Sequence, residues 1–216
     1  TIVVNTSDSK NFMSLNNKQQ KTQAIIKAAC HYFLQYGYNG ATTDLIQKKA
    51  GVSKATLYNH FPTKESLFAS VVNTQCKHFI EQVRAISLPD MHFSESLFRI
   101  GEAYLTLLLA PENQALFRAV VAEAPRFPGL AKTFYDAGPA SILPVIAEAV
   151  NRALQKHELA DNGCEPLRLA TDFITVLRGQ SQMYCLLHPD FIPDQNIIAE
   201  WVSEAVDILL NQVSLP

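Results

Sequence analysis

The chain has 216 residues, 48% of them hydrophobic and 18% charged, an ordinary globular balance that supports a core without metal or disulfide help. The longest apolar runs, such as residues 105–110, are far too short to span a membrane, so we exclude a membrane protein and expect a cytoplasmic one. The net charge of −2 hides an asymmetry, because residues 1–84 carry +6 and residues 85–216 carry −8.

The N-terminal part of the chain is expected to form a flexible arm followed by a helix. Residues 1–16 are polar and lack apolar periodicity, which indicates an arm without regular structure. Small and aromatic apolar residues then recur at helical spacing up to Gly37, and glycine is a common C-terminal cap of a helix. This helix opens a first domain that we place at residues 17–64.

Two short helices joined by a tight turn are expected next. Thr42 or Thr43 can cap the first of them, which stops at Gly51. Ser53 can cap the second, and the sequence HFP at residues 60–62 ends it. A pair of short helices around a turn that contains glycine is typical of a helix-turn-helix.

The second domain, residues 65–216, is expected to be a series of helices. Thr63 can cap a long helix that reaches about residue 87. Further on, Pro139 suits the first position of a helix, whereas Pro144 indicates a kink or a later start. No long period-2 strand is found, so the fold class is all-α. The later helices are expected at residues 94–110, 111–124, 139–157, 166–187 and 193–213.

The predicted helix-turn-helix has a polar and basic free face. Val52, Leu57 and Phe61 anchor its second helix, and Gly51 permits the left-handed turn. A DNA major groove admits one α-helix, which needs a small residue for close approach, hydroxyls and amides for base edges, and cations for phosphates. The free positions hold these side-chain types. The candidate DNA-binding residues are Thr42, Thr43, Ser53, Lys54, Ala55, Thr56, Tyr58, Asn59, His60 and Lys64.

Two other interpretations of this basic half were weighed. An amphipathic helix pair with a solvated basic face is common, but the tight turn, the polar free positions and the charge of +6 favour an anionic partner. A membrane surface is disfavoured, because the bases lie on short helices and not on one long basic amphipathic helix. Double-stranded DNA is therefore the expected partner.

The segment TTDLIQKKAGVSKATLYNHFPTKESLF, residues 42–68, resembles the DNA-binding domain of the TetR family of transcriptional regulators. The resemblance covers residues 18–67. One clear departure is Gln47, where the family usually has Ala, and this side chain can point outward or toward the phosphate backbone. The segment EAPRFPGLAKTFYDAGP, residues 123–139, resembles the AefR-like subgroup of C-terminal domains. The matching positions of the first segment are Ile46, Ala50, Gly51, Val52, Ser53, Thr56, Leu57, Tyr58, His60, Phe61, Lys64, Glu65 and Leu67.

The resemblance implies a homodimer that binds a palindromic operator, represses transcription in most members, and releases DNA when a small molecule enters the C-terminal domain. It also implies that the last two long helices form the dimer interface. Small residues there allow close helix approach, although each position could equally belong to the core of one subunit. The expected interface residues are Ala170, Ile174, Leu177, Trp201, Ala205 and Ile208.

An apolar or aromatic effector is expected between the middle helices. Aromatic residues there can line a cavity, and each is also an ordinary candidate for the core. Arg178 and Gln182 are polar and can orient a ligand. The candidate effector-binding residues are Phe98, Tyr104, Phe117, Phe134, Phe173 and Arg178.

No enzyme is expected, because the sequence contains no GxSxG, HExxH, Walker or GxGxxG motif. The four cysteines are scattered and the histidines are dispersed, so neither a metal site nor a cofactor is expected, and the thiols are interpreted as reduced. Two alternatives remain: a DNA-binding regulator without a small-molecule ligand, and an activator of the same fold.

Overall fold

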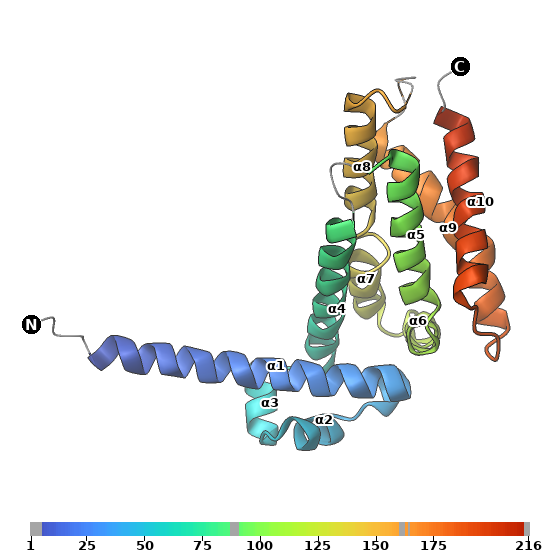
Figure 1. Ribbon diagram of the computed structural model, residues 1–216. Helices are drawn as coiled ribbons and strands as arrows, with labels where there is room; N and C mark the ends of the chain where they lie inside the picture. The colour runs from blue at the N-terminus through green and yellow to red at the C-terminus, as the bar shows by residue number, and fades with distance from the viewer. Residues whose placement is uncertain (1–5, 87–90, 160–162, 164, 214–216) are drawn as a thin grey trace, which may run out of the picture. The chain divides into compact units, whose positions relative to one another are not determined.

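The computed structural model describes residues 6–86, 91–159, 163 and 165–213. These residues form ten helices and no strand, which confirms the all-α class (Figure 1). The helices are α1 (Thr6–Gly40), α2 (Thr43–Ala50), α3 (Lys54–His60), α4 (Lys64–Ile86), α5 (Phe93–Leu109), α6 (Pro111–Glu123), α7 (Pro128–Ala137), α8 (Leu143–Gln155), α9 (Pro166–Leu187) and α10 (Gln195–Val213).

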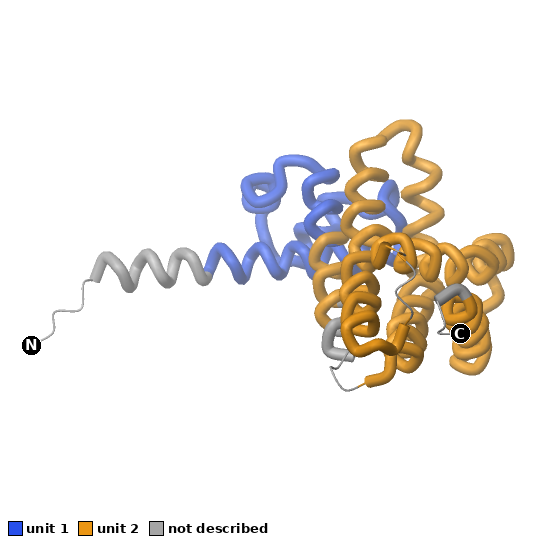
Figure 2. The backbone as a smooth tube through the Cα atoms, turned by 90° about the horizontal axis from the view of Figure 1, so that it is seen from above, with its two compact units in different colours: residues 1–71 blue, residues 72–216 orange. Residues whose placement is uncertain are grey.

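The chain divides into two compact units, residues 1–71 and 72–216 (Figure 2). The division falls inside α4, after its first two turns, whereas the sequence placed a boundary at the start of this helix. Those two turns belong to the N-terminal unit because their apolar side chains are buried there. The ring of Phe68 lies edge-on to those of Phe33 and Tyr38, at centroid distances of 5.1 and 5.3 Å.

The first helix is longer than the sequence indicates. α1 begins at Thr6, so the expected arm is wrong for residues 6–16, and residues 1–5 lie outside the described part. Extending an existing helix adds a backbone hydrogen bond for each residue fixed, without a new nucleation cost, so a polar segment can continue it. At the other end Gly37 has φ 68° and kinks the helix at the residue predicted to end it.

Local capping positions α2 and α3 as predicted. Thr42 Oγ1 accepts a hydrogen bond from the backbone N–H of Leu45 at 3.3 Å, and Ser53 Oγ accepts one from that of Thr56 at 3.1 Å. Gly51 between the helices adopts the left-handed conformation at φ 67°, ψ 30°. Each cap satisfies a donor that a helix end leaves without an intrahelical partner, so the short helices are defined by their own residues.

Four helices of the C-terminal unit share one core. α5 packs beside α8 and α10, and α9 packs against all three (Figure 1). The approach of α5 to α10 depends on Gly101, because a Cβ added there would lie 2.7 Å from Val202 Cγ1. The largest fully buried side chains of this unit are Phe173, Leu97, Ile100, Leu105, Ile142 and Ile146.

One further sequence expectation for this unit changed. α8 begins at Leu143, so the expected start at Pro139 is wrong and Pro144 marks a late start. A helix running through from Pro139 would bring the Pro144 ring against the carbonyl group four residues earlier, and a turn replaces it. The segment between α6 and α8 contains the short helix α7. Within the described residues, no helix has the length and apolar character needed to cross a membrane.

Candidate nucleic-acid interface and ligand cavity

The free face of α3 is exposed as the sequence predicts. Leu57 and Phe61 are buried in the N-terminal unit and hold one side of the helix. On the remaining surface the side chains of Lys54, Ala55 and Asn59 are exposed, and so are those of Thr42 and Tyr58, whereas Thr43, Thr56, His60 and Lys64 are half-buried. The face therefore presents a small residue, an amide, hydroxyls and a cation over two helical turns.

Side-chain contacts tie this face to α2. Lys54 Nζ donates to Asp44 Oδ1 at 2.9 Å, and this bond raises the pKa of the lysine. The hydroxyls of Tyr58 and Thr43 lie 3.3 Å apart. Both contacts cross the turn, so they hold the exposed side chains of α3 in a defined register with the start of α2.

Two expected residues are held by other parts of the N-terminal unit. His60 Nδ1 lies 2.9 Å from Thr22 Oγ1 of α1. Lys64 Nζ donates to the carbonyl oxygen of Asn39 at 3.3 Å and lies 4.7 Å from the centroid of the Tyr38 ring. Thr22 was missed by sequence reasoning, because it is 38 residues from His60 and no local pattern connects them.

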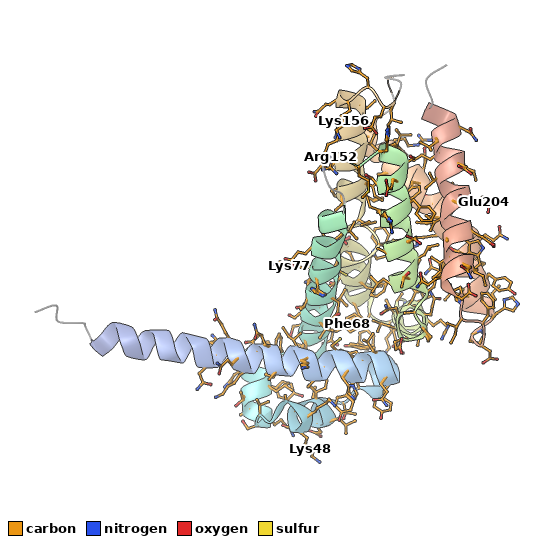
Figure 3. All side chains as sticks on the ribbon, in the orientation of Figure 1. Lys48, Phe68, Lys77, Arg152, Lys156 and Glu204 are labelled. Carbon is orange, nitrogen blue, oxygen red and sulfur yellow. The ribbon has the colours of Figure 1, made fainter. Side chains whose placement is uncertain are left out.

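A polar cleft of about 270 Å³ lies between α1 and α3. From α3 it is lined by Thr56, Asn59 and His60, and from α1 by Asn17, Lys18 and Lys21. The α1 lysines were not among the candidate residues, although the basic charge of residues 1–84 includes them. Lys48 of α2 extends on the side of that helix that faces away from α1 (Figure 3). Cations thus come from α1, α2 and α3 together.

Gln47, the departure from the family pattern, is half-buried and does not extend freely into solvent. Its amide nitrogen lies 3.5 Å from Asp44 Oδ1, the oxygen that also binds Lys54. Its Oε1 is buried and has no hydrogen-bond partner among the described residues. The amide of Gln47 therefore adds a second donor to the carboxylate that pairs with Lys54. Its own carbonyl oxygen remains a buried acceptor without a hydrogen bond, which is unfavourable.

The C-terminal unit contains a separate, mainly apolar cavity of about 540 Å³ among α6, α8, α9 and the α7 region. Among the candidate effector residues, Phe117 and Arg178 line it. Phe134 lies behind Phe117, with ring centroids 6.2 Å apart. The other lining residues are Val121, Tyr135, Pro139, Leu143, Thr171, Ile174, Thr175, Gly179, Gln182, Met183 and Leu186.

The other three effector candidates do not line this cavity. Tyr104 and Phe173 are buried in the core of the unit, and Phe98 packs against that core. A helical side chain faces the core or a cavity according to the rotation of its helix, which the sequence does not specify to within one residue. Gln182, which the sequence suggested beside Arg178 as a polar residue able to orient a ligand, also lines the cavity.

A polar pair on α9 stands at the wall of the cavity. Arg178 Nε donates to Gln182 Oε1 at 2.9 Å. Gln182 is 6% exposed, and its Nε2 has no hydrogen-bond partner among the described residues. Burial raises the pKa of the Tyr104 hydroxyl, while the neighbouring guanidinium of Arg178 acts in the opposite direction. Arg178 therefore contacts the buried Tyr104 hydroxyl and also lines the cavity.

The expected dimer residues lie mostly inside one subunit. Ala170, Ile174, Leu177 and Ala205 are buried in the core of the C-terminal unit, so these four side chains present almost no surface to a partner, and their interface role stays a prediction. Trp201 is half-buried and Ile208 is 38% exposed. The two helices have one apolar face toward the core and a second toward solvent. The large exposed apolar residues of α9 are Leu167, Val176, Met183, Tyr184 and Leu187.

The described cysteines are free thiols in protected positions. Burial raises the pKa of Cys30 and Cys185, and that of Cys76 to about 11. A thiol with a raised pKa is a poor nucleophile and a poor metal ligand at neutral pH. Within the described residues, no group of three or more His, Cys, Asp or Glu side chains could hold a metal ion.

Comparison with known families identifies both units. Residues 25–71 match the profile of bacterial regulatory proteins of the tetR family, and residues 95–212 match the C-terminal domain of AefR-like transcriptional repressors. The chain is 34% identical over 87 residues to the uncharacterized HTH-type transcriptional regulator YhgD of Bacillus subtilis, covering 40% of this chain and 44% of YhgD. The chain thus spans about half the length of the curated relatives that it matches.

Solved structures match over most of the chain. A TetR-family transcriptional regulator of Mesorhizobium loti superimposes with a TM-score of 0.82 at 22% identity, covering 92% of this chain and 98% of that one. The flavonoid-responsive regulator FrrA gives a TM-score of 0.72 at 29% identity, covering 90% and 97%. At 22% identity the first similarity concerns the fold alone, whereas at 29% identity the similarity to FrrA also includes the sequence.

Proposed function

This chain belongs to the TetR family of DNA-binding transcriptional regulators, and on that premise we propose that it is a cytoplasmic repressor that binds a palindromic operator as a homodimer and is released by a small apolar or aromatic effector. The observation that carries the proposal is the exposed face of α3, where Lys54, Ala55 and Asn59 stand on a helix that capping and two buried apolar residues hold in place.

The proposed contacts divide into two kinds. Ala55, Thr56 and Asn59 face base edges, where a small side chain, a hydroxyl and an amide distinguish bases in the major groove. The remaining candidates hold phosphate and position the helix without reading sequence. They are Thr42, Thr43, Ser53, Lys54, Tyr58, His60 and Lys64, to which the geometry adds Lys18, Lys21 and Lys48.

The homodimer is proposed on the exposed apolar face of α9 together with α10. Val176, Tyr184 and Leu187 recur at helical spacing, and Ile208 lies on α10. A contiguous apolar surface of this kind marks an interaction site. A twofold dimer places its two recognition helices in major grooves about 34–36 Å apart, one turn of the duplex.

The effector is proposed to occupy the cavity of the C-terminal unit. Its walls are mainly aliphatic and aromatic, and its volume of about 540 Å³ lies in the usual range for small-molecule sites. The relative FrrA is named as responsive to flavonoids, which are aromatic. An effector releases DNA only if it binds the DNA-free conformation more tightly than the DNA-bound one. The ratio of these two effector affinities equals the factor by which the effector lowers operator affinity.

The test begins with the DNA beside the gene of this protein. An inverted repeat there, labelled with a fluorophore, is expected to bind the protein as a dimer, and apolar small molecules that raise its thermal midpoint are expected to release it. Binding without any ligand that stabilises or releases would contradict the effector part alone. Failure to protect any inverted repeat would contradict the proposal as a whole.

A further inference from the structure

The effector cavity has one polar position among apolar walls. Arg178 and Gln182 lie one turn apart on α9, and the lining residues around them include no Asp or Glu. From this arrangement we propose that the effector carries an oxygen acceptor, most favourably a carboxylate, that binds Gln182 Nε2 and the Arg178 guanidinium. This inference rests on the proposed ligand-responsive function and specifies the chemistry of its ligand.

The orientation of the Gln182 amide follows from its partner. A guanidinium only donates hydrogen bonds, so the atom 2.9 Å from Arg178 Nε must be the amide oxygen. The Nε2 group is then a buried donor that no described residue satisfies, in a side chain that lines the cavity. A buried donor without an acceptor is costly, and a bound ligand that supplies one removes the cost.

Arg178 adds a positive charge beside that donor. Its side chain is half-buried and lines the cavity, and it contacts Tyr104 and Gln182, which are both uncharged. No carboxylate partner of this arginine is found among the cavity residues. A carboxylate or a polarised carbonyl oxygen of a ligand would therefore bind the Arg178 guanidinium and the Gln182 amide together. Hydrogen bonds that involve a charged group are stronger than those between neutral groups.

The rest of the wall defines the body of the ligand. Phe117, Leu143, Ile174 and Leu186 offer apolar contact, and the hydroxyls of Thr171 and Thr175 already donate to backbone carbonyls of α9. The ligand is therefore an apolar molecule with its acceptor at one end. An aromatic acid or ketone and an aliphatic carboxylate share this chemistry, and the experiment distinguishes them.

Two matched pairs of probes test the inference by titration calorimetry at constant ionic strength: 2-naphthoate against 2-methylnaphthalene, and octanoate against octylammonium. In at least one pair the carboxylate is expected to bind about tenfold more tightly than its partner, the size expected of a charged hydrogen bond. If 2-naphthoate shows this preference, the apolar part of the effector is aromatic; if octanoate shows it, that part is aliphatic.

The variant Gln182→Leu is expected to lose about three- to tenfold of the carboxylate preference while its thermal midpoint stays close to that of the wild type. Gln182→Met serves as a second variant of similar size if leucine disturbs packing. Gln180→Leu is the matched control, because Gln180 is exposed on the same helix and does not line the cavity. It is expected to leave the preference unchanged.

The possible results separate the acceptor inference from the proposed repressor function. Equal binding and equal operator release by carboxylates and their partners would overturn the acceptor inference and leave the proposed repressor function standing. A preference that persists in both Gln182 variants would also overturn it. No binding by any probe, with operator binding intact, would overturn this inference together with the effector part of the proposed function.

Discussion

The two units of this protein use opposite kinds of surface. The N-terminal unit exposes a polar and basic face on α3, and buried apolar residues such as Leu57 support that face from behind. The C-terminal unit exposes apolar side chains on α9 and has a mainly apolar cavity that is open to solvent. The charge of the sequence divides in the same direction, +6 in residues 1–84 and −8 beyond.

The difference between the two surfaces fits the partners proposed for them. A polyanion is bound by charge and by hydrogen bonds at a surface. Its site therefore needs side chains held in fixed positions on that surface, and it does not need a deep cavity. A small apolar ligand or a second subunit is bound by removing apolar surface from water, so its site needs shape and area. A substitution that damages one unit should therefore leave the chemistry of the other intact, and the predictions below test this separation.

The largest effect is expected on the DNA-binding face. Ala55→Glu places a carboxylate on the exposed face of α3 that is proposed to enter the major groove, and we expect operator affinity to fall about a hundredfold or more without loss of stability. Fluorescence anisotropy with labelled operator measures it. The control is Thr106→Glu, an exposed position on α5 that should leave affinity unchanged. Equal losses in both variants would show a general charge effect and not a local contact.

The second effect separates the two faces of α9. Leu187 is 69% exposed, so Leu187→Glu should leave the free energy of unfolding nearly unchanged but shift the protein toward monomer and weaken operator binding about tenfold. Leu177 is 2% exposed, and Leu177→Ala should instead destabilise the fold by about 2–5 kcal/mol. Sedimentation and urea unfolding distinguish them. A dimeric Leu187→Glu variant would remove this face from the interface.

The third effect is confined to the core of the C-terminal unit. Gly101→Val puts side-chain atoms where Val202 already lies 2.7 Å from a Cβ, so we expect a loss of about 1–3 kcal/mol in urea unfolding. Adding Val202→Ala should recover part of that loss, because it opens the space. A stable single variant would mean that α5 and α10 separate easily.

The smallest effect concerns Gln47. Gln47→Ala removes a buried acceptor without a partner and introduces a better helix former, so we expect a gain of about 0.5–1 kcal/mol in stability. Operator affinity should change less than about twofold, since Asp44 and Lys54 still pair. A loss of stability in thermal unfolding would indicate that the amide makes a bond important to the fold.

The helix-turn-helix could be predicted residue by residue because its determinants are local. Thr42, Gly51 and Ser53 act on backbone groups within four residues of themselves, and a sequence displays such signals directly. For Pro144 the same reasoning left a kink or a late start open, and the structure shows the late start, with α8 beginning at Leu143. That reasoning did not find Thr22, whose contact with His60 depends on how α1 and α3 pack.

The sites of the C-terminal unit were harder to predict because they depend on helix rotation. α9 has apolar residues on nearly every side, so periodicity alone does not separate the core face of Ile174 and Leu177 from the exposed face of Val176 and Leu187. A change of one residue in register moves a side chain by about 100° around the helix. Four of the six dimer candidates are therefore buried within the subunit, whereas Trp201 and Ile208 keep exposed surface, and three of the six effector candidates pack in or against the core.

The central claim is that residues of α1, α2 and α3 neutralise DNA phosphates in both subunits of a dimer. Titration of operator affinity against salt tests it most directly. If each subunit holds roughly four to six phosphates, the slope of log affinity against log salt should be about −7 to −11. A slope near zero would contradict the claim, whatever the sequence of the operator.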